Sequence, residues 1–238
     1  MSRLSFRAVT ARKSNSKSAH QPHGTPMHWI LFANGSCTPS PHIRDLVAGA
    51  DCLVGVDGGS RHLLALDIQP HIVIGDMDSI APDTLRTYQE TGVTLHPHPA
   101  KKDATDLELA MDLAFSGGAT RITFLGMTGG RLDHTLANVL LLARCLDRGI
   151  PACVTNADQT IHMTDSVLNL TGCVGDTLSL VPVTPEVRGV TLTGLEYPLR
   201  EATLNFASTW GMSNVLTSSL AQVRLRHGRL LVFHLHDV

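Results

Sequence analysis

Short apolar runs alternate with helical patterns from residue 27 to about residue 157. The apolar runs predict strands at 28–35, 52–59, 71–76, 93–97, 121–126 and 152–158. Apolar residues recur every three or four positions in the intervening segments, which predicts helices at 41–50, 60–67, 81–92, 104–118 and 132–149. Such alternation favours an α/β fold, a Rossmann-like, mainly parallel sheet with helices on both faces.

The pattern changes after about residue 158, where the segments become short, rich in Thr and Val, and punctuated by Gly, Pro and Asn. They predict strands at 159–165, 166–172, 176–183, 188–195, 196–200, 202–208, 221–228 and 229–238. No helical period longer than one turn is present, so this region predicts a small antiparallel β-sandwich or barrel, of which we expect the sandwich. We therefore expect two folded domains, at 27–157 and 158–238.

Charge and cysteine content narrow the classes of partner. The formal net charge of the 238 residues is -2. Residues 1–26 carry five basic and no acidic side chains, so the rest of the chain has a net charge of -7. We expect 1–26 to be a basic disordered leader, although a transit peptide or an upstream start codon fits equally well. The acidic body predicts no nucleic-acid partner, and no apolar stretch is long enough for a membrane span. Five scattered cysteines without a C-x-x-C pair fit a reducing cytoplasm.

The stretch "HIVIGDMDSIAPD" places Asp76 and Asp78 two positions apart at the end of a predicted strand. In open α/β sheets, this end of a strand is where ligands bind. Two close carboxylates repel each other unless a cation lies between them, and a divalent ion is the usual cation. The alternative is that Asp78 caps the helix that follows.

Two further loops carry candidate residues. In "VDGGS", Asp57 precedes Gly58 and Gly59 at a strand-to-helix junction, where glycines let the backbone approach a phosphate, although such glycines are also common in turns without a ligand. In "KKDATDLELA", Asp103 and Asp106 are three positions apart at a helix start, next to Lys101 and Lys102. Acidic residues there also interact favourably with the helix dipole, but adjacent lysines suit a metal-bound polyphosphate.

The loop "GMTGGRLDH" is the most informative of these segments. Its candidate ligand-binding residues are Thr128, Gly129, Gly130, Arg131, Asp133 and His134. An arginine fork suits bidentate phosphate contact, and the N-terminus of the following helix adds partial positive charge. The alternative is that Asp133 caps the helix, Arg131 is solvated and His134 is structural. Several aspartates gathered at one sheet edge with basic residues favour Mg²⁺-dependent transfer of a phosphoryl or diphosphoryl group.

In this order and spacing, "DGG", "GDMDS", "KKDATDLELA" and "GGRLDHTLAN" resemble the thiamine pyrophosphokinase family. In the second domain, "GDTLSLVPV", "GLEYPLREATL" and "STWGMSNV" are also similar to that family. The resemblance implies a homodimeric enzyme that transfers diphosphate from ATP to thiamine and releases AMP, with thiamine bound between subunits.

The resemblance also implies roles for individual residues. The Mg²⁺ ligands would be Asp76, Asp78, Asp103 and Asp106, with Asp57 and Asp133 close by. The "DGG" and "GGRLDH" loops would hold ATP. Lys102 and Arg131 would stabilise the transferring phosphates, and Asp78 or Asp103 could accept the hydroxyl proton, with no base assigned between them. Thiamine would contact Trp210, Ser213 and Asn214.

Three departures from the family pattern are His71, Met77 and Val215, and Val215 replaces a Glu that often follows "SN". The alternatives are a diphosphokinase for another heterocyclic alcohol, such as a hydroxymethylpterin, and a non-catalytic nucleotide- or thiamine-binding module. A haloacid-dehalogenase-like phosphatase also carries Asp-x-Asp after a strand, but that motif normally follows the first strand.

Overall fold

The computed structural model describes residues 27–99 and 103–236. The predicted leader at 1–26 and the predicted phosphate-binding Lys102 lie outside the described residues. The first part of the chain alternates strands and helices as predicted. Its elements are β1 (His28–Phe32), α1 (Pro41–Ala48), β2 (Cys52–Val56), the 3₁₀ turn η1 (Asp57–Gly59), α2 (Ser60–Ala65), β3 (Ile72–Gly75), α3 (Pro82–Glu90), β4 (Thr94–Pro97), α4 (Asp106–Ser116), β5 (Arg121–Leu125), α5 (Leu132–Leu140), α6 (Leu142–Asp147) and β6 (Ala152–Thr155).

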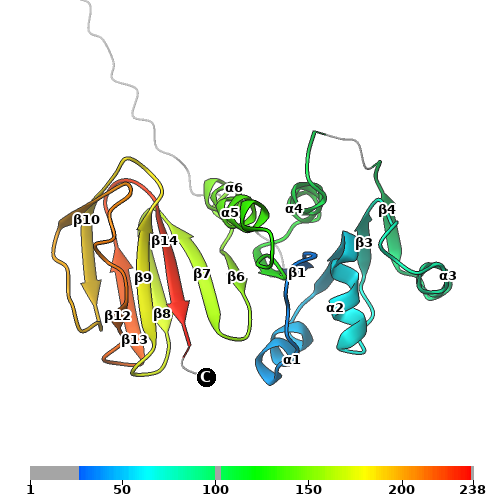
Figure 1. Cartoon of the computed structure of the whole chain (residues 1–238), viewed down its shortest axis with the longest axis horizontal. Coiled ribbons are helices and arrows are strands. Elements are labelled where there is room, and N and C mark those ends of the chain that lie inside the picture. Colours follow the sequence, from blue (N-terminus) through cyan, green and yellow to red (C-terminus); the bar gives the residue numbers. More distant parts are fainter. Residues whose placement is uncertain (1–26, 100–102, 237–238) are drawn as a thin grey trace, which may run out of the picture.

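Six parallel strands form the larger part of a ten-stranded sheet (Figure 1), which we call the parallel half, and the order of the sheet is β12-β9-β14-β7-β6-β5-β1-β2-β3-β4. The parallel half ends at β6, which pairs with β5 in parallel and with β7 in antiparallel orientation, for example at Cys153 and His162. The sheet is therefore continuous across the predicted domain boundary near residue 157.

Helices pack on both faces of the parallel half because successive side chains of a strand point to opposite faces. Trp29 and Leu31 of β1 face a core that includes Met111 of α4 and Leu142 of α6. Ile30 and Phe32 face the opposite core, which α1 and α2 complete. The prediction of a mainly parallel sheet covered on both sides is confirmed.

The second part of the chain is all β. Its strands are β7 (Gln159–Thr164), β8 (Val167–Thr171), β9 (Thr177–Pro182), β10 (Glu186–Thr193), β11 (Ala202–Asn205), β12 (Asn214–Val215), β13 (Leu220–Arg224) and β14 (Leu230–Leu235). A separate antiparallel sheet of order β11-β10-β13-β8 shares an apolar core with the antiparallel end of the large sheet. The predicted antiparallel sandwich is confirmed.

Two local predictions are wrong and one element was not predicted. The strand expected at 196–200 is absent from that described segment, which forms bends around Pro198, a residue with no backbone N–H to donate to a ladder. The helix expected at 132–149 is interrupted at Leu141 and forms α5 and α6. The two-residue strand β12 is too short to leave a periodic pattern in the sequence.

Across residues 27–99 and 103–236, none of the helices combines the length and the apolar character needed to cross a bilayer.

Candidate active site

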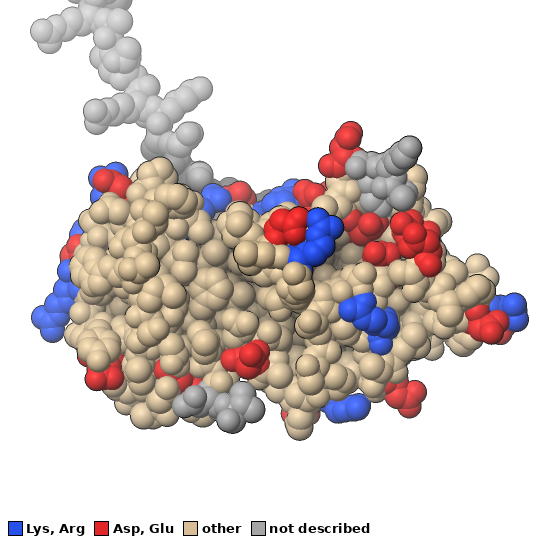
Figure 2. Space-filling model, in the orientation of Figure 1, with Lys and Arg blue, Asp and Glu red and all other residues tan. Residues whose placement is uncertain are grey.

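The carboxyl ends of β1, β2, β3 and β5 lie at one edge of the sheet because these strands are parallel neighbours. The segments that follow them are 33–36, η1, 76–81 and 126–131. Figure 2 shows acidic side chains gathered toward the end of the molecule that holds β3 and β4. Most predicted site residues of the first part of the chain are on these segments.

Three carboxylates converge at the ends of β2 and β3. Asp57, Asp76 and Asp78 each offer an oxygen, and these oxygens lie within 4.8 Å of one another. We call these three residues the acid group. The Asp78 backbone N–H donates to Oδ1 of Asp76 at 3.2 Å, and the Ser79 hydroxyl donates to Oδ1 of Asp57 at 3.0 Å. The acid group presents oxygen ligands only, which are the ligands that Mg²⁺ prefers.

The neighbouring carboxylates change the pKa of Asp78. Its pKa is raised above the ordinary value, first by its hydrogen bond with Asp76, then by the charge of Asp76, and less by partial desolvation and the charge of Asp57. A cation bound among the three carboxylates would relieve the repulsion among them. Asp78 does not cap α3, since the N-cap is Ala81 and no side chain bonds there, so the alternative interpretation of Asp78 as a cap is wrong.

Unusual backbone conformations bring these two loops together. Asp57 has φ 51° and Met77 has φ 65°, both in the left-handed region that non-glycine residues seldom adopt. Gly75 has φ 146°, and a Cβ there would lie 3.0 Å from Cα of Asp57. Such conformations are often retained where a site requires them.

The predicted metal ligands Asp103 and Asp106 are not part of the acid group. Asp106 is the first residue of α4, and Thr105 and Glu108 close a capping box around it. Thr105 accepts from the Glu108 backbone, while the Glu108 carboxylate accepts from the Thr105 backbone. The cap is therefore supplied by Thr105 and Glu108, and metal binding by Asp103 and Asp106 stays a prediction.

The loops after β1 and β5 enclose a cavity of about 420 Å³. Backbone hydrogen bonds join the two loops, from Gly35 N–H to Gly126 O at 2.7 Å and from Ser36 N–H to Thr128 O at 2.6 Å. We call this cavity the loop pocket. Its lining includes the predicted residues Thr128, Gly129, Gly130, Arg131 and His134, together with Asn34, Gly35, Thr135 and Asn138.

Arg131 and Asp133 form an exposed ion pair beside the loop pocket. The Arg131 guanidinium donates to both carboxylate oxygens of Asp133, at 2.6 and 3.2 Å. The hydrogen bond from Arg131, then that from the His134 backbone, lowers the pKa of Asp133 to about 2. Arg131 is the N-cap of α5 without a side-chain cap, so the alternative in which Asp133 caps the helix is wrong. Because the pair is exposed, it adds little stability and leaves the cation accessible to an anion.

Packing explains Gly58 and Gly59 of the "DGG" loop without a ligand. Both are buried, and a Cβ on Gly59 would lie 1.9 Å from the carbonyl oxygen of Phe32. A Cβ on Gly58 would lie 2.6 Å from Oδ1 of Asn34. Their contact with ATP stays a prediction.

Two residues that sequence reasoning missed hold these loops in place. Arg61 of α2 donates to the carbonyl oxygens of Asn34, Gly35 and Gly58 at 2.8, 2.9 and 3.3 Å. The His62 ring donates to Gly35 O at 2.9 Å, and burial, followed by the charge of Arg61, lowers the pKa of His62. The only signal in the sequence was a basic pair directly after "GGS".

The predicted thiamine-binding segment lies at the opposite end of the ten-stranded sheet. Trp210 is 56% exposed in the loop before β12, and Ser213 has φ 55°. Asn214 is buried and holds the backbone of Tyr197, accepting from its N–H at 3.0 Å and donating to its carbonyl at 2.8 Å. The Asn214 side chain thus fixes the shape of this segment, and its contact with thiamine stays a prediction.

Comparisons with known proteins identify the family. The model described as "Thiamin pyrophosphokinase, catalytic domain" matches residues 43–154, and "Thiamin pyrophosphokinase, vitamin B1 binding domain" matches residues 158–230. A thiamine pyrophosphokinase from Bacillus subtilis is 32% identical over 204 residues, covering 84% of this chain and 95% of the relative. The chain belongs to the thiamine pyrophosphokinase family. The resemblance in the sequence is thereby confirmed.

Solved thiamine pyrophosphokinase structures agree with the fold. The Bacillus subtilis crystal structure has a TM-score of 0.78 at 30% identity and covers 89% of this chain and all of its own. The Geobacillus thermodenitrificans structure has a TM-score of 0.75 at 30% identity, with 90% and 98% covered. At 16% identity the Candida albicans structure, with a TM-score of 0.76, supports the fold alone.

Within one chain of this thiamine pyrophosphokinase family member, the acid group and the predicted thiamine-binding segment lie far apart. Seven strands separate β3, which precedes Asp76, from β12, which follows Trp210. Strands are about 4.8 Å apart, so eight strand spacings amount to on the order of 40 Å along the sheet. Figure 1 shows β3 and β12 toward opposite ends of the molecule.

Proposed function

We propose that this protein transfers a diphosphate from ATP to the hydroxyl of thiamine, giving thiamine diphosphate and AMP. Family membership supports the enzyme class. The observation that carries the proposal is the convergence of Asp57, Asp76 and Asp78 at the same sheet edge as the loop pocket. Carboxylates that concentrate negative charge at the same sheet edge as this pocket suit a polyphosphate substrate that arrives with divalent cations.

The acid group would hold Mg²⁺, with Asp103 and Asp106 as further predicted ligands. Its donor set fits, because it consists of carboxylate oxygens that lie within 4.8 Å of one another, and a cation between them would relieve their mutual repulsion. When bound, Mg²⁺ neutralises phosphate charge and helps to orient the transferring group.

The loop pocket would bind the phosphates of ATP. Exposed Gly129 and Gly130 leave backbone N–H groups accessible, and the N-terminus of α5 adds partial positive charge. Asp133 holds the Arg131 guanidinium in a defined orientation through two hydrogen bonds. Arg131 would stabilise charge on the transferring group, while Arg61 and His62 hold the loop backbone of the pocket through hydrogen bonds to its carbonyl oxygens.

In the transfer step, the thiamine hydroxyl oxygen forms a bond to the β-phosphorus of ATP. The bond from that phosphorus to the oxygen bridging the α- and β-phosphates breaks, and AMP leaves with the bond's electron pair. The hydroxyl proton passes to a carboxylate, Asp78 or Asp103, or to water. In such loose transition states, the positioning of the reactants contributes more than the base.

We further propose that the active enzyme is a homodimer in which the acid group of one subunit faces the Trp210 segment of the other. The separation of these two regions within one chain supports this arrangement. Exposed apolar side chains suited to a partner surface lie on α5, at Leu132, Leu136 and Leu140. The Trp210 indole would stack on the cationic thiamine ring.

The five unpaired cysteines support the predicted cytoplasmic location, since thiols stay reduced there.

Asp76→Asn tests the acid group, with Asp83→Asn as the matched control. Asp83 is an exposed acid on α3 that forms an ion pair with Arg86 and lies outside the acid group. We expect Asp76→Asn to reduce AMP formation at least about 100-fold while the fold is retained, because a ligand of the cation is lost. Near-normal turnover of Asp76→Asn and Asp78→Asn, in a protein that makes AMP, would contradict the metal assignment.

A further inference from the structure

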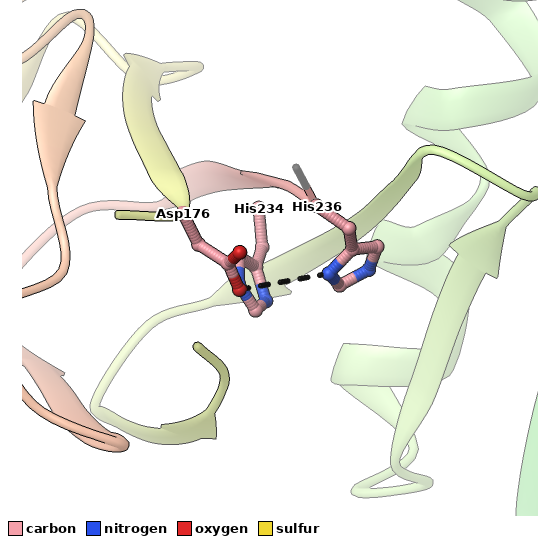
Figure 3. A group of neighbouring side chains, drawn as sticks. All are labelled: Asp176, His234 and His236. Atoms are coloured by element: carbon pink, nitrogen blue, oxygen red, sulfur yellow. Dashed lines mark hydrogen bonds and ion pairs between the residues drawn. The ribbon is translucent and has the colours of Figure 1, made fainter. Parts of the chain in front are cut away.

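A second cluster of metal-ligand residues lies in the β-sandwich, away from the acid group. It consists of Asp176, in the turn before β9, His234 of β14, and His236, just beyond β14. One ligand atom from each lies within 4.8 Å of the other two. Figure 3 shows both imidazole rings directed toward the Asp176 carboxylate.

The two histidines approach the same carboxylate oxygen. His234 Nε2 lies 2.7 Å from Oδ2 of Asp176, and His236 Nδ1 lies 3.8 Å from that atom. The rings meet edge to face with centroids 4.4 Å apart. A hydrogen bond explains the His234 contact, whereas 3.8 Å is too long for one, so His236 faces the oxygen at ion-pair distance.

These distances suit a small cation. A tetrahedral zinc ion with bonds of about 2.0–2.1 Å keeps its ligand atoms about 3.3 Å apart. The observed 2.7 and 3.8 Å lie on either side of that value, so side-chain movements of about half an ångström would bring both nitrogens to the expected distance from the oxygen around one ion.

The surroundings fix the three side chains. Only 3% of the His234 side chain and 4% of the Asp176 side chain are exposed. The Cys173 backbone N–H donates to Oδ2 of Asp176 at 2.9 Å, and Thr160 Oγ1 lies 3.2 Å from Nε2 of His236. A polar partner on the far nitrogen of an imidazole is the usual way a ligating histidine is oriented.

Gly172 keeps space beside the cluster. A Cβ there would lie 2.7 Å from Oδ2 of Asp176 and from Nε2 of His234. Any other residue at this position would therefore displace two of the three proposed ligand atoms.

We propose that Asp176, His234 and His236 form a binding site for a transition-metal dication of the zinc type. Two imidazoles and one carboxylate suit Zn²⁺, Co²⁺ or Ni²⁺, whereas Mg²⁺ prefers all-oxygen sites such as the acid group. Three protein ligands leave a fourth position for water, on the side where His236 is 33% exposed. The bound ion would fasten the last strand, β14, to the turn between β8 and β9.

The test uses the full chain without an affinity tag, titrated with Co²⁺ in excess Mg²⁺, which occupies the acid group. The readouts are visible absorption of tetrahedral Co²⁺ and its displacement by Zn²⁺. The variants are His236→Gln, which alters a partly exposed side chain at the chain end, and Asp176→Asn. The control is His227→Gln, an exposed histidine outside the cluster.

We expect one Co²⁺ per wild-type chain and per His227→Gln chain, displaced by one Zn²⁺. Binding should weaken at least about 100-fold in His236→Gln and Asp176→Asn, because each loses a ligand. Circular dichroism establishes that the variants are folded. Absence of tetrahedral Co²⁺ absorption in the wild type, or equal binding by folded His236→Gln, would overturn the proposal.

Discussion

Mixing two impaired variants should restore activity if each active site draws on two subunits. Asp76→Asn removes a carboxylate of the acid group, and Trp210→Ala removes the ring that would stack on thiamine, worth about 2 kcal/mol or about 30-fold in kcat/KM. The two residues follow and precede strands that are on the order of 40 Å apart in one chain. In a mixed dimer one site carries both lesions and the other carries neither.

The expected recovery follows from random pairing. Equal amounts of the two chains give half mixed dimers, each with one intact site of two, so the mixture should reach about a quarter of wild-type activity. The assay co-refolds the chains and measures AMP release at limiting thiamine, where the loss of stacking lowers the rate. Co-purification through a tag on one chain confirms subunit exchange.

A control pair separates complementation from nonspecific rescue. Asp76→Asn mixed with Asp78→Asn leaves every subunit with one altered residue in its own acid group, so no mixed dimer has an intact site, and activity should stay low. The proposed arrangement is refuted if mixed dimers of Asp76→Asn and Trp210→Ala form but are no more active than the separate variants.

Three further changes have expected outcomes. Gly59→Ala should lower the free energy of unfolding by about 3 kcal/mol, because the new Cβ would lie 1.9 Å from a backbone carbonyl oxygen. A Cβ on Gly130 would meet no described atom within 4 Å, so Gly130→Ala is the control. Chemical denaturation compares Gly59→Ala with Gly130→Ala, and equal stabilities would contradict this explanation. The pKa of Asp78 is raised, so protons compete with the cation at a higher pH than they would at an isolated aspartate. The Mg²⁺ concentration that gives half of the maximal rate should therefore increase as the pH falls from neutral toward about 5. A Mg²⁺ requirement that is constant over this range would contradict it. Arg61→Lys should raise the KM for ATP several-fold with a smaller change in kcat, because one ammonium cannot bind three carbonyl oxygens in the guanidinium geometry. Initial rates at varied ATP test this, and an unchanged KM would show that Arg61 does not shape the pocket.

Most of the first half of the fold was predictable because its signals are local. Apolar runs and helical periods are read within one segment, and glycines follow α1 and α4, at Gly49 and Gly117, where they act as C-caps. The antiparallel pairing of β6 with β7 was not predictable in this way. It depends on which edge of the sheet remains available, and so the continuous ten-stranded sheet emerged only from the structure.

The same difference between local and long-range signals decides which parts of the candidate site could be predicted. Asp76 and Asp78 were predicted as partners because two residues of one loop must lie close together. Asp57 was expected nearby from the family resemblance, and the structure places its carboxylate in the same group from the end of β2. Arg61 was missed because an arginine in the first turn of a helix looks the same in sequence whether it is solvated or bonded to carbonyl oxygens. The Asp176 and His234 contact joins residues 58 positions apart, which no spacing rule connects.

The most direct test of the proposed reaction is phosphorus NMR of the purified protein with ATP, Mg²⁺ and thiamine, with and without a chelator. Diphosphoryl transfer predicts AMP and thiamine diphosphate in equal amounts, no ADP, and no reaction once the chelator is added. ADP as the product, or product formation unaffected by the chelator, would contradict attack at the β-phosphorus by a metal-dependent enzyme. ATP that stays intact with thiamine but yields AMP with a hydroxymethylpterin would assign another acceptor, with Val215 beside Asn214 the first residue to examine.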